Sequence, residues 1–143
     1  MSKHKLVNKP IGLFAQISRI DEEQRLVYGV ATDETPVREW DDIEVVVSHA
    51  ATKQAVERWL EWGNIREMHQ PSAVGVATEV SFNDATRETF LTARIVDDPA
   101  WEKVKAKVYK GFSIQGPIHA WEQPDEKVKR IVVTNYDLNE ISL

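Results

Sequence analysis

An alternation of apolar and other residues near the start of the chain constrains the fold most. Every second position from Ile11 to Ile17 is apolar, the spacing that places side chains on one face of a strand. Polar residues 21–24 then provide a turn, and residues 26–31 form a second apolar stretch. We expect a β-hairpin here, which is a typical way for a barrel to begin.

A first helix is predicted after this hairpin. Residues 33–42 are predicted to form a loop, because they contain Pro36 and several carboxylates, and they lead into the apolar run 45–47. Ser48 can cap the helix that follows, and Gly63 provides its stop. The apolar positions that share one face of this helix are Ala55, Val56, Trp59 and Leu60.

A second hairpin and a second helix follow. Residues 74–82 and 90–96 are predicted strands, joined by a turn that opens at residues 83–84. Asp98 and Pro99 make a good cap and first-turn pair for the helix, which ends at Gly111. Its apolar stripe consists of Ala100, Val104 and Val108.

The rest of the chain is predicted to form strands, at residues 112–121 and 127–136, with a short one at 140–143. Together these elements predict a mostly β protein with flanking helices (α+β), an antiparallel β-barrel of about six or seven strands. The 143 residues, 42% of them hydrophobic, can bury one sizeable core but not two. We therefore expect a single domain over residues 1–143.

Composition excludes several kinds of site. The chain has no cysteine, so a nucleophile must be an oxygen or an amine. Its net charge of -5 argues against nucleic-acid binding, and the lysines of residues 103–110 alternate with apolar residues as on a solvated helix face. No apolar run reaches the roughly 20 residues of a membrane span, and no metal-ligand or phosphate-loop spacing occurs. We expect no cofactor, no metal and no membrane partner.

The candidate chemistry depends on a serine and a histidine. Ser113 lies in Gly-Phe-Ser-Ile-Gln-Gly (residues 111–116), on a predicted strand directly after a helix. A serine hydroxyl becomes a nucleophile when an imidazole within about 3 Å takes its proton. His69 is the best candidate among four histidines, because His4 is near the terminus and His49 begins a helix. The ordinary alternative is a strand hydroxyl bonded to backbone and a surface histidine.

Three motifs together resemble one protein family. They are Asn-Ile-Arg-Glu-Met-His-Gln (residues 64–70), Tyr-Lys-Gly-Phe-Ser-Ile (109–114) and Leu-Asn-Glu-Ile-Ser-Leu (138–143). In this order the chain resembles the prohead (head-maturation) serine proteases of tailed bacteriophages, whose barrel is similar to that of the herpesvirus assembly proteases. The resemblance covers roughly the last two-thirds of the chain. It implies a herpesvirus-protease-like barrel in which Ser113 and His69 are catalytic.

A third catalytic residue should hold the imidazole of His69 in the right tautomer, and three candidates stay open. His119 would share one side of its strand with Ser113, and the herpesvirus relatives use a second histidine. However, six residues of straight strand span about 20 Å. Asp97 follows the strand 90–96, whose end should return beside residues 74–75, close to His69.

Glu140 is the third candidate, because it lies in the last motif and the barrel could fold that strand against Ser113. Its ordinary alternative is a carboxylate paired with Arg66 or Arg130. No oxyanion hole is assigned, since backbone amides leave no side-chain pattern. Gly111 and Gly116 are suggested only as positions of close approach.

The resemblance also implies a function. It implies a serine endopeptidase that cleaves scaffold and capsid-protein extensions, and itself, during phage head maturation. Its partners would be the phage major capsid protein and the scaffold, with a homo-oligomer such as a dimer expected, inside the assembling prohead in the host cytoplasm. Relatives typically continue past the last motif, so we expect a trimmed form or one part of a longer precursor.

Two alternative functions stay open. One is a catalytically silent barrel that serves as a scaffolding or capsid-assembly binding module. The other is a hydrolase that uses the same residues on a non-peptide ester. Five tryptophans bear on the first: Trp59 and Trp101 are expected in the core, while Trp40, Trp62 and Trp121 are candidates for a partner-binding surface.

Overall fold

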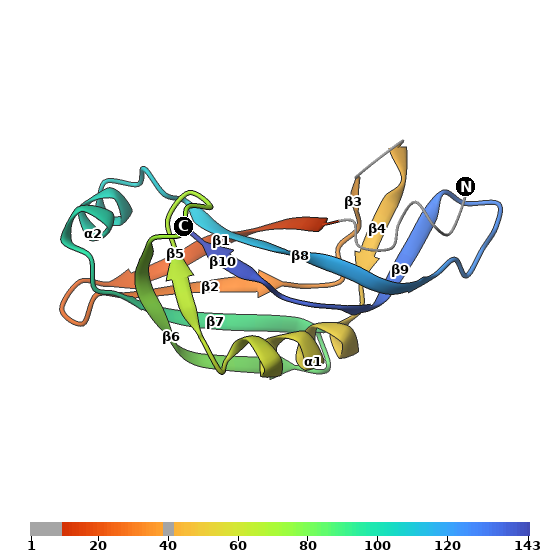
Figure 1. The fold of residues 1–143 in the computed structure, drawn as a ribbon, viewed down its shortest axis with the longest axis horizontal. Helices are drawn as coiled ribbons and strands as arrows, with labels where there is room; N and C mark the ends of the chain where they lie inside the picture. The colour runs from red at the N-terminus through yellow and green to blue at the C-terminus, as the bar shows by residue number, and fades with distance from the viewer. Residues whose placement is uncertain (1–9, 39–41) are drawn as a thin grey trace.

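The computed structural model describes residues 10–38 and 42–143. His4 and Trp40, both considered above, lie outside the described residues. Figure 1 shows long strands with one helix at the end of the molecule and another along its side. The elements in chain order are β1 (Pro10–Asp21), β2 (Leu26–Thr32), β3 (Val37–Arg38), β4 (Glu44–Val47), α1 (His49–Trp59), β5 (Asn64–Arg66), β6 (Ala73–Asn83), β7 (Glu88–Ile95), α2 (Asp98–Lys105), β8 (Gly111–Glu122), β9 (Arg130–Tyr136) and β10 (Glu140–Ser142).

Seven of the strands close into a barrel. They follow the order β1-β2-β7-β6-β5-β10-β8, and β8 pairs back with β1. The pair β5–β10 is parallel, and its neighbours in the barrel are antiparallel. The prediction of a mostly β fold with a barrel of about six or seven strands and flanking helices is thus confirmed.

A second sheet extends from the barrel. β8 is long enough to pair with β1 and β10 through its first half and with β9 through its second half. β9 continues to β4 and β3, and these three strands project beyond the barrel at one end in Figure 1. Sequence reasoning missed β3, which lies inside the predicted loop 33–42 and has only two residues.

The core follows from alternation along the strands. In β7, Leu91, Ala93 and Ile95 are buried while Phe90 and Arg94, which point the other way, are exposed. Burying each large apolar side chain contributes roughly 1.5–3 kcal/mol. The largest side chains that are fully buried in the described residues include Tyr136, Phe112, Ile65, Leu91, Ile118 and Ile131.

Helix α1 begins where the sequence predicted. The Ser48 hydroxyl accepts a hydrogen bond of 3.1 Å from the Ala51 amide, and Trp59 is buried against the core. Gly63 has a φ of 57° and donates its amide to the Trp59 carbonyl, the left-handed stop that favours glycine. Leu60 lies just past the helix and is 43% exposed, so it does not belong to the apolar face.

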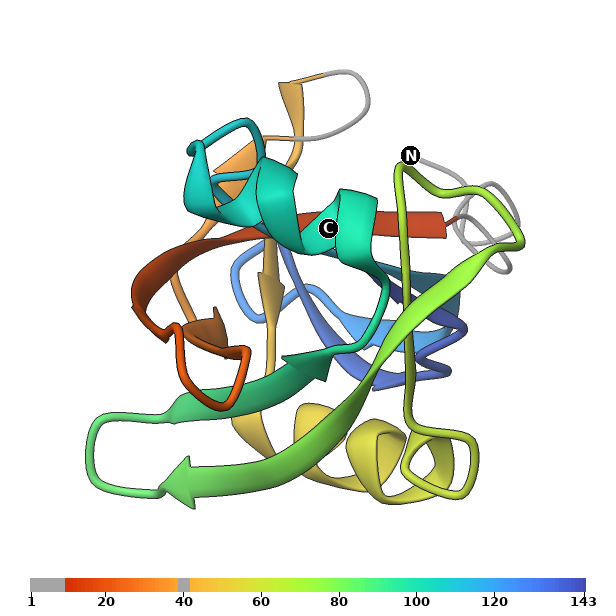
Figure 2. The same ribbon diagram turned by 90° about the vertical axis from the view of Figure 1, so that its left-hand side faces the viewer.

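Helix α2 differs from the prediction at both ends. Asp97, not Asp98, is the cap, since its carboxylate accepts from the Ala100 amide at 3.0 Å. Asp98 instead pairs with Arg25 at 2.6 Å. The helix ends at Lys105, so Val108 leaves the apolar stripe and is 62% exposed. Figure 2 shows α2 across the end of the barrel, where its buried residues are Ala100, Trp101 and Val104.

Neither helix can span a bilayer: in the described part of the chain, none is long and apolar enough.

Strand β5 was also missed by sequence reasoning. It has three residues, of which only Ile65 is buried, and so offers almost no alternation to detect. β5 fixes the start of the loop that carries His69.

Candidate active site

Three adjacent barrel strands carry the motifs noted in the sequence. Ser113 of β8 lies directly opposite Ser142 of β10, and Ser142 also pairs with Arg66 of β5. Paired residues project from the same face of a sheet, so these three side chains share the outer face of the barrel. The adjacent residue of each strand points inward and is buried: Ile114, Ile141 and Ile65.

His69 and Glu140 are in direct contact on this face. His69 Nδ1 lies 2.6 Å from Glu140 Oε1. The glutamate side chain is only 11% exposed, whereas that of the histidine is 41% exposed. With its proton on Nδ1, His69 donates to the carboxylate and keeps Nε2 as an acceptor. Of the three candidates for orienting His69, Glu140 is therefore the one that the fold brings to it.

Glu140 is held in place by two further side chains. The buried Ser142 hydroxyl donates to Glu140 Oε1 at 2.5 Å, and Arg66 Nη1 lies 3.8 Å from Oε2. The ion pair with Arg66, which was the ordinary alternative for Glu140, is thus present alongside the contact with His69, whereas Arg130 pairs with Glu44. Ser142 was missed by sequence reasoning, although its position two residues after Glu140 places both on one face of a strand.

Ser113 lies one strand away from this cluster. It is half-buried, and its partner Ser142 belongs to the neighbouring strand. Among the described residues, its hydroxyl makes no hydrogen bond with His69. Catalytic hydrogen bonds are often long in unliganded enzymes and tighten in the substrate complex. The fold therefore brings Ser113 and His69 to one face without joining them.

The loop that bears His69 is strained and anchored. Met68 and His69 have φ values of 51° and 58°, a left-handed conformation that costs such residues roughly 1–2 kcal/mol each. The Met68 amide donates to the Leu143 carbonyl at 2.9 Å, which fixes the loop to the end of β10. Such strain persists only where surrounding contacts impose it, and it is concentrated at functional sites.

A second anchor comes from Glu67 in the same loop. Its carboxylate accepts hydrogen bonds from the Tyr109 hydroxyl at 2.6 Å and from Lys103 at 3.1 Å. The Tyr109 hydrogen bond, aided by Lys103, lowers the pKa of Glu67. Tyr109 lies just before β8, so this contact ties the His69 loop to the strand that carries Ser113.

The other two candidates for the third residue have different partners. Asp97 caps α2 through the Ala100 amide. His119 Nε2 lies 2.8 Å from the Asp137 carboxylate, and this hydrogen bond lowers the pKa of Asp137. The predicted alternation of β8 is present, because Ser113 and His119 are half-buried or exposed while Ile114 is buried.

No group of three or more metal-ligating side chains is positioned to hold an ion in residues 10–38 and 42–143. Gly116 is a position of close approach, as the sequence suggested: a Cβ atom there would lie 1.5 Å from the Asp137 carbonyl oxygen.

Comparison of the chain with protein-family models, with curated proteins and with solved structures finds no match.

Proposed function

We propose that this protein is a serine endopeptidase in which Ser113 is the nucleophile, His69 the general base and Glu140 the residue that orients His69. The observation that carries the proposal is the 2.6 Å contact between His69 Nδ1 and Glu140 Oε1, on the face that Ser113 shares. A carboxylate behind an imidazole fixes the tautomer whose free nitrogen accepts a proton, and it stabilises the cation that results.

The proposed reaction has two half-reactions, and in each of them His69 acts first as a base and then as an acid. Ser113 Oγ attacks the scissile carbonyl carbon while His69 Nε2 takes the hydroxyl proton. The C–N bond then breaks, and the leaving amine receives that proton from His69. A water molecule, deprotonated by His69, attacks the resulting ester. The bond from the acyl carbon to Ser113 Oγ then breaks, His69 returns the proton to Ser113 Oγ, and the acid is released. Throughout, Glu140 keeps its charge and compensates the imidazolium.

The biological setting of the proposal comes from the three motifs. In their order these motifs resemble those of the prohead proteases, so the proposed substrates are scaffold and capsid-protein extensions during phage head maturation, with self-cleavage included. A homo-oligomer and a site of action inside the assembling prohead belong to the same proposal.

One observation favours the alternative of a catalytically silent barrel that binds capsid or scaffold proteins. The Ser113 hydroxyl makes no hydrogen bond with His69 among the described residues, so the base and the nucleophile are not engaged in the resting state. A silent module would keep this arrangement permanently, whereas an enzyme would close it when a peptide binds.

The deciding experiment is intact-mass analysis after co-expression with the neighbouring coat and scaffold proteins. Wild type is compared with Ser113→Ala and His69→Ala, and Ser81→Ala serves as the matched control because Ser81 is an exposed serine of another strand, β6. Truncations shared by wild type and Ser81→Ala but absent from the other two support a serine endopeptidase. Identical masses in all four contradict it and favour the silent barrel.

A parallel assay with a small activated acyl ester separates the remaining alternative. Ester turnover that depends on Ser113 and His69, without truncation of any protein, indicates a hydrolase of non-peptide esters.

A further inference from the structure

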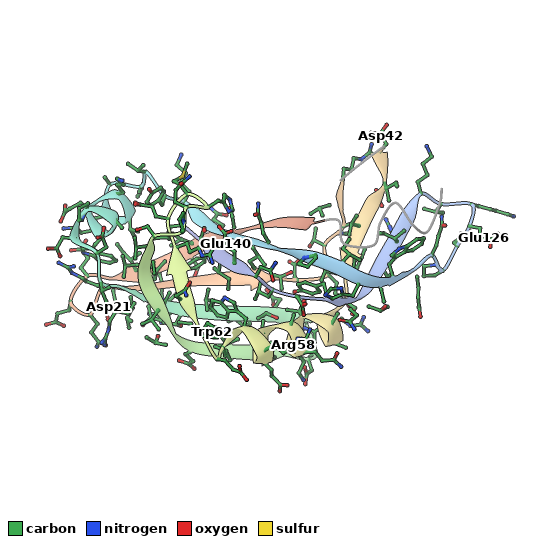
Figure 3. All side chains as sticks on the ribbon, viewed as in Figure 1. Asp21, Asp42, Arg58, Trp62, Glu126 and Glu140 are labelled. Carbon is green, nitrogen blue, oxygen red and sulfur yellow. The ribbon has the colours of Figure 1, made fainter. Side chains whose placement is uncertain are left out.

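A cavity of about 400 Å³ opens beside the proposed active site. It lies between the end of α1, the start of β5 and the segment that leads into β10. Figure 3 shows Glu140, Trp62 and Arg58 in the same central part of the molecule. The polar and aromatic residues that matter in its wall are Arg58, Trp62, Asn64, Arg66, Asp137 and Asn139.

Two arginines of this wall have hydrogen-bonding capacity to spare. Arg58 uses only Nη2, which donates to the Tyr136 carbonyl at 2.9 Å and lies 3.2 Å from Asp137. Its Nε and Nη1 have no partner in the described residues. The Arg66 guanidinium lies 3.8 Å from Glu140, which is beyond hydrogen-bond distance. The side chains of Asn64 and Asn139 also make no hydrogen bond with a described residue.

The charge of the wall favours an anion. Asp137 is the one carboxylate among its residues, and it already contacts both Arg58 and His119. The free N–H groups of Arg58 and Arg66 can each donate a charge-assisted hydrogen bond to a carboxylate, which is stronger than a hydrogen bond between neutral groups. The cavity is therefore suited to a carboxylate group.

Trp62 adds an apolar surface at the rim. Its side chain is 80% exposed, the largest exposed fraction among the large hydrophobic residues of the described chain. An indole in this position can cover the aliphatic part of a ligand whose charged end reaches the arginines. A peptide that carries a glutamate or an aspartate has both parts.

We propose that this cavity is a subsite for a carboxylate of the peptide substrate, so that the preferred substrates are acidic. The inference rests on the proposed function for its link to cleavage. From Ser142, opposite Ser113, to Leu138 in the cavity wall the chain spans four residues, or about 13 Å of extended strand. An extended peptide would place its acidic residue about four residues from the bond that is cut.

The test measures binding without cleavage, in the full chain carrying Ser113→Ala. Three peptides are titrated while the indole N–H signal of Trp62 is followed by NMR. They are acetyl-Ala-Ala-Glu-Ala-Ala-amide, the same peptide with Gln for Glu, and the Gln peptide with a free C-terminal carboxylate. Because a charge-assisted pair is worth about one factor of ten in affinity, the carboxylate peptides should bind roughly tenfold more tightly than the neutral one.

The arms of the experiment separate the possible results. A preference for the Glu peptide assigns the site to a side chain, and a preference for the free C-terminus assigns it to a chain end. Equal affinity of all three peptides overturns the proposal. Arg58→Gln should abolish the preference, whereas Arg94→Gln, an exposed arginine of β7 outside the cavity, should retain it. Trp62→Ala lacks the NMR reporter, so its affinities are measured by isothermal titration calorimetry, and all three peptides should bind more weakly by a similar factor.

These outcomes do not depend on catalysis. A silent barrel would still prefer carboxylate peptides if the cavity is an anion subsite. If the protein is an active peptidase that cuts the Glu and Gln peptides equally well, the carboxylate subsite is contradicted and the proposed endopeptidase function stands.

Discussion

The hydroxyl of Tyr109 donates a 2.6 Å hydrogen bond to the carboxylate of Glu67 and thereby joins the two segments that carry the proposed catalytic pair. Glu67 stands two residues before His69, and Tyr109 stands four residues before Ser113. The distance between base and nucleophile thus depends on a contact that neither of them makes. Tyr109 and Glu67 are positioning residues in this scheme.

Tyr109→Phe should lower the free energy of unfolding by about 1 kcal/mol at neutral pH, because it removes one hydrogen bond to a charged group that is partly solvated. It should also lower kcat more than it raises KM, since the displaced base affects the reaction rather than binding. Urea unfolding and steady-state kinetics check the two effects. Tyr28→Phe is the matched control, because the Tyr28 hydroxyl has no hydrogen bond with a described side chain.

The stability cost of Tyr109→Phe should depend on pH. The pKa of Glu67 is lowered from its ordinary value of 4.5 by Tyr109 and Lys103. A group with a depressed pKa stabilises the fold fully above its unfolded value, and this contribution is lost as the pH falls through the folded value. The difference between wild type and Tyr109→Phe should therefore be constant above about pH 5.5 and shrink below pH 4.5. A difference that grows on acidification would contradict this assignment.

The barrel was predictable from the sequence because its long strands alternate. Residues 11–17 and 26–31 lie within β1 and β2, and residues 74–82 lie within β6. The sequence could not predict β5 or the extent of α2. β5 is too short to show a period. The chain turns after α2 with a φ of 61° at Lys107, a backbone conformation that the spacing of the lysines does not reveal.

The candidate site was predictable in its members but not in its contacts. The motifs named His69, Ser113 and Glu140, yet spacing along the chain could not choose among Asp97, Glu140 and His119. The choice is made by the parallel pairing of β10 with β5, which brings Glu140 beside the loop that follows Arg66. Pairing between strands so distant in sequence is a property of the whole sheet.

Mutation should separate the three candidates for the residue that orients His69. Glu140→Gln keeps the size but loses the charge, and it should reduce turnover by about 10³-fold or more. Asp97→Ala removes a helix cap and should cost about 1 kcal/mol of stability while turnover stays within about threefold. His119→Ala should likewise keep turnover. Equal losses in Glu140→Gln and His119→Ala would contradict the role given to Glu140.

Ser142→Ala should impair catalysis by loosening Glu140. The Ser142 hydroxyl is fully buried and bonds to the same carboxylate oxygen as His69. Its loss leaves a buried acceptor short of a donor, which costs about 1–3 kcal/mol of stability. We expect kcat to fall by about tenfold with KM unchanged, measured beside Ser81→Ala. A variant that is less stable but has wild-type kcat would limit Ser142 to a structural role.

Gly116 provides the sharpest test of the fold around the site. It lies in β8 three residues after Ser113, and a Cβ atom there would lie 1.5 Å from the Asp137 carbonyl oxygen, which belongs to the backbone. Because the backbone of neither β8 nor the 137–139 segment can give way cheaply, Gly116→Ala should cost about 3 kcal/mol or more. Gly12→Ala is the control, since nothing lies within 4 Å of a Cβ atom there, and its stability should stay within about 0.5 kcal/mol or rise slightly. Thermal unfolding of the two variants measures the difference, and equal midpoints would mean that β8 does not pack against the 137–139 segment as described.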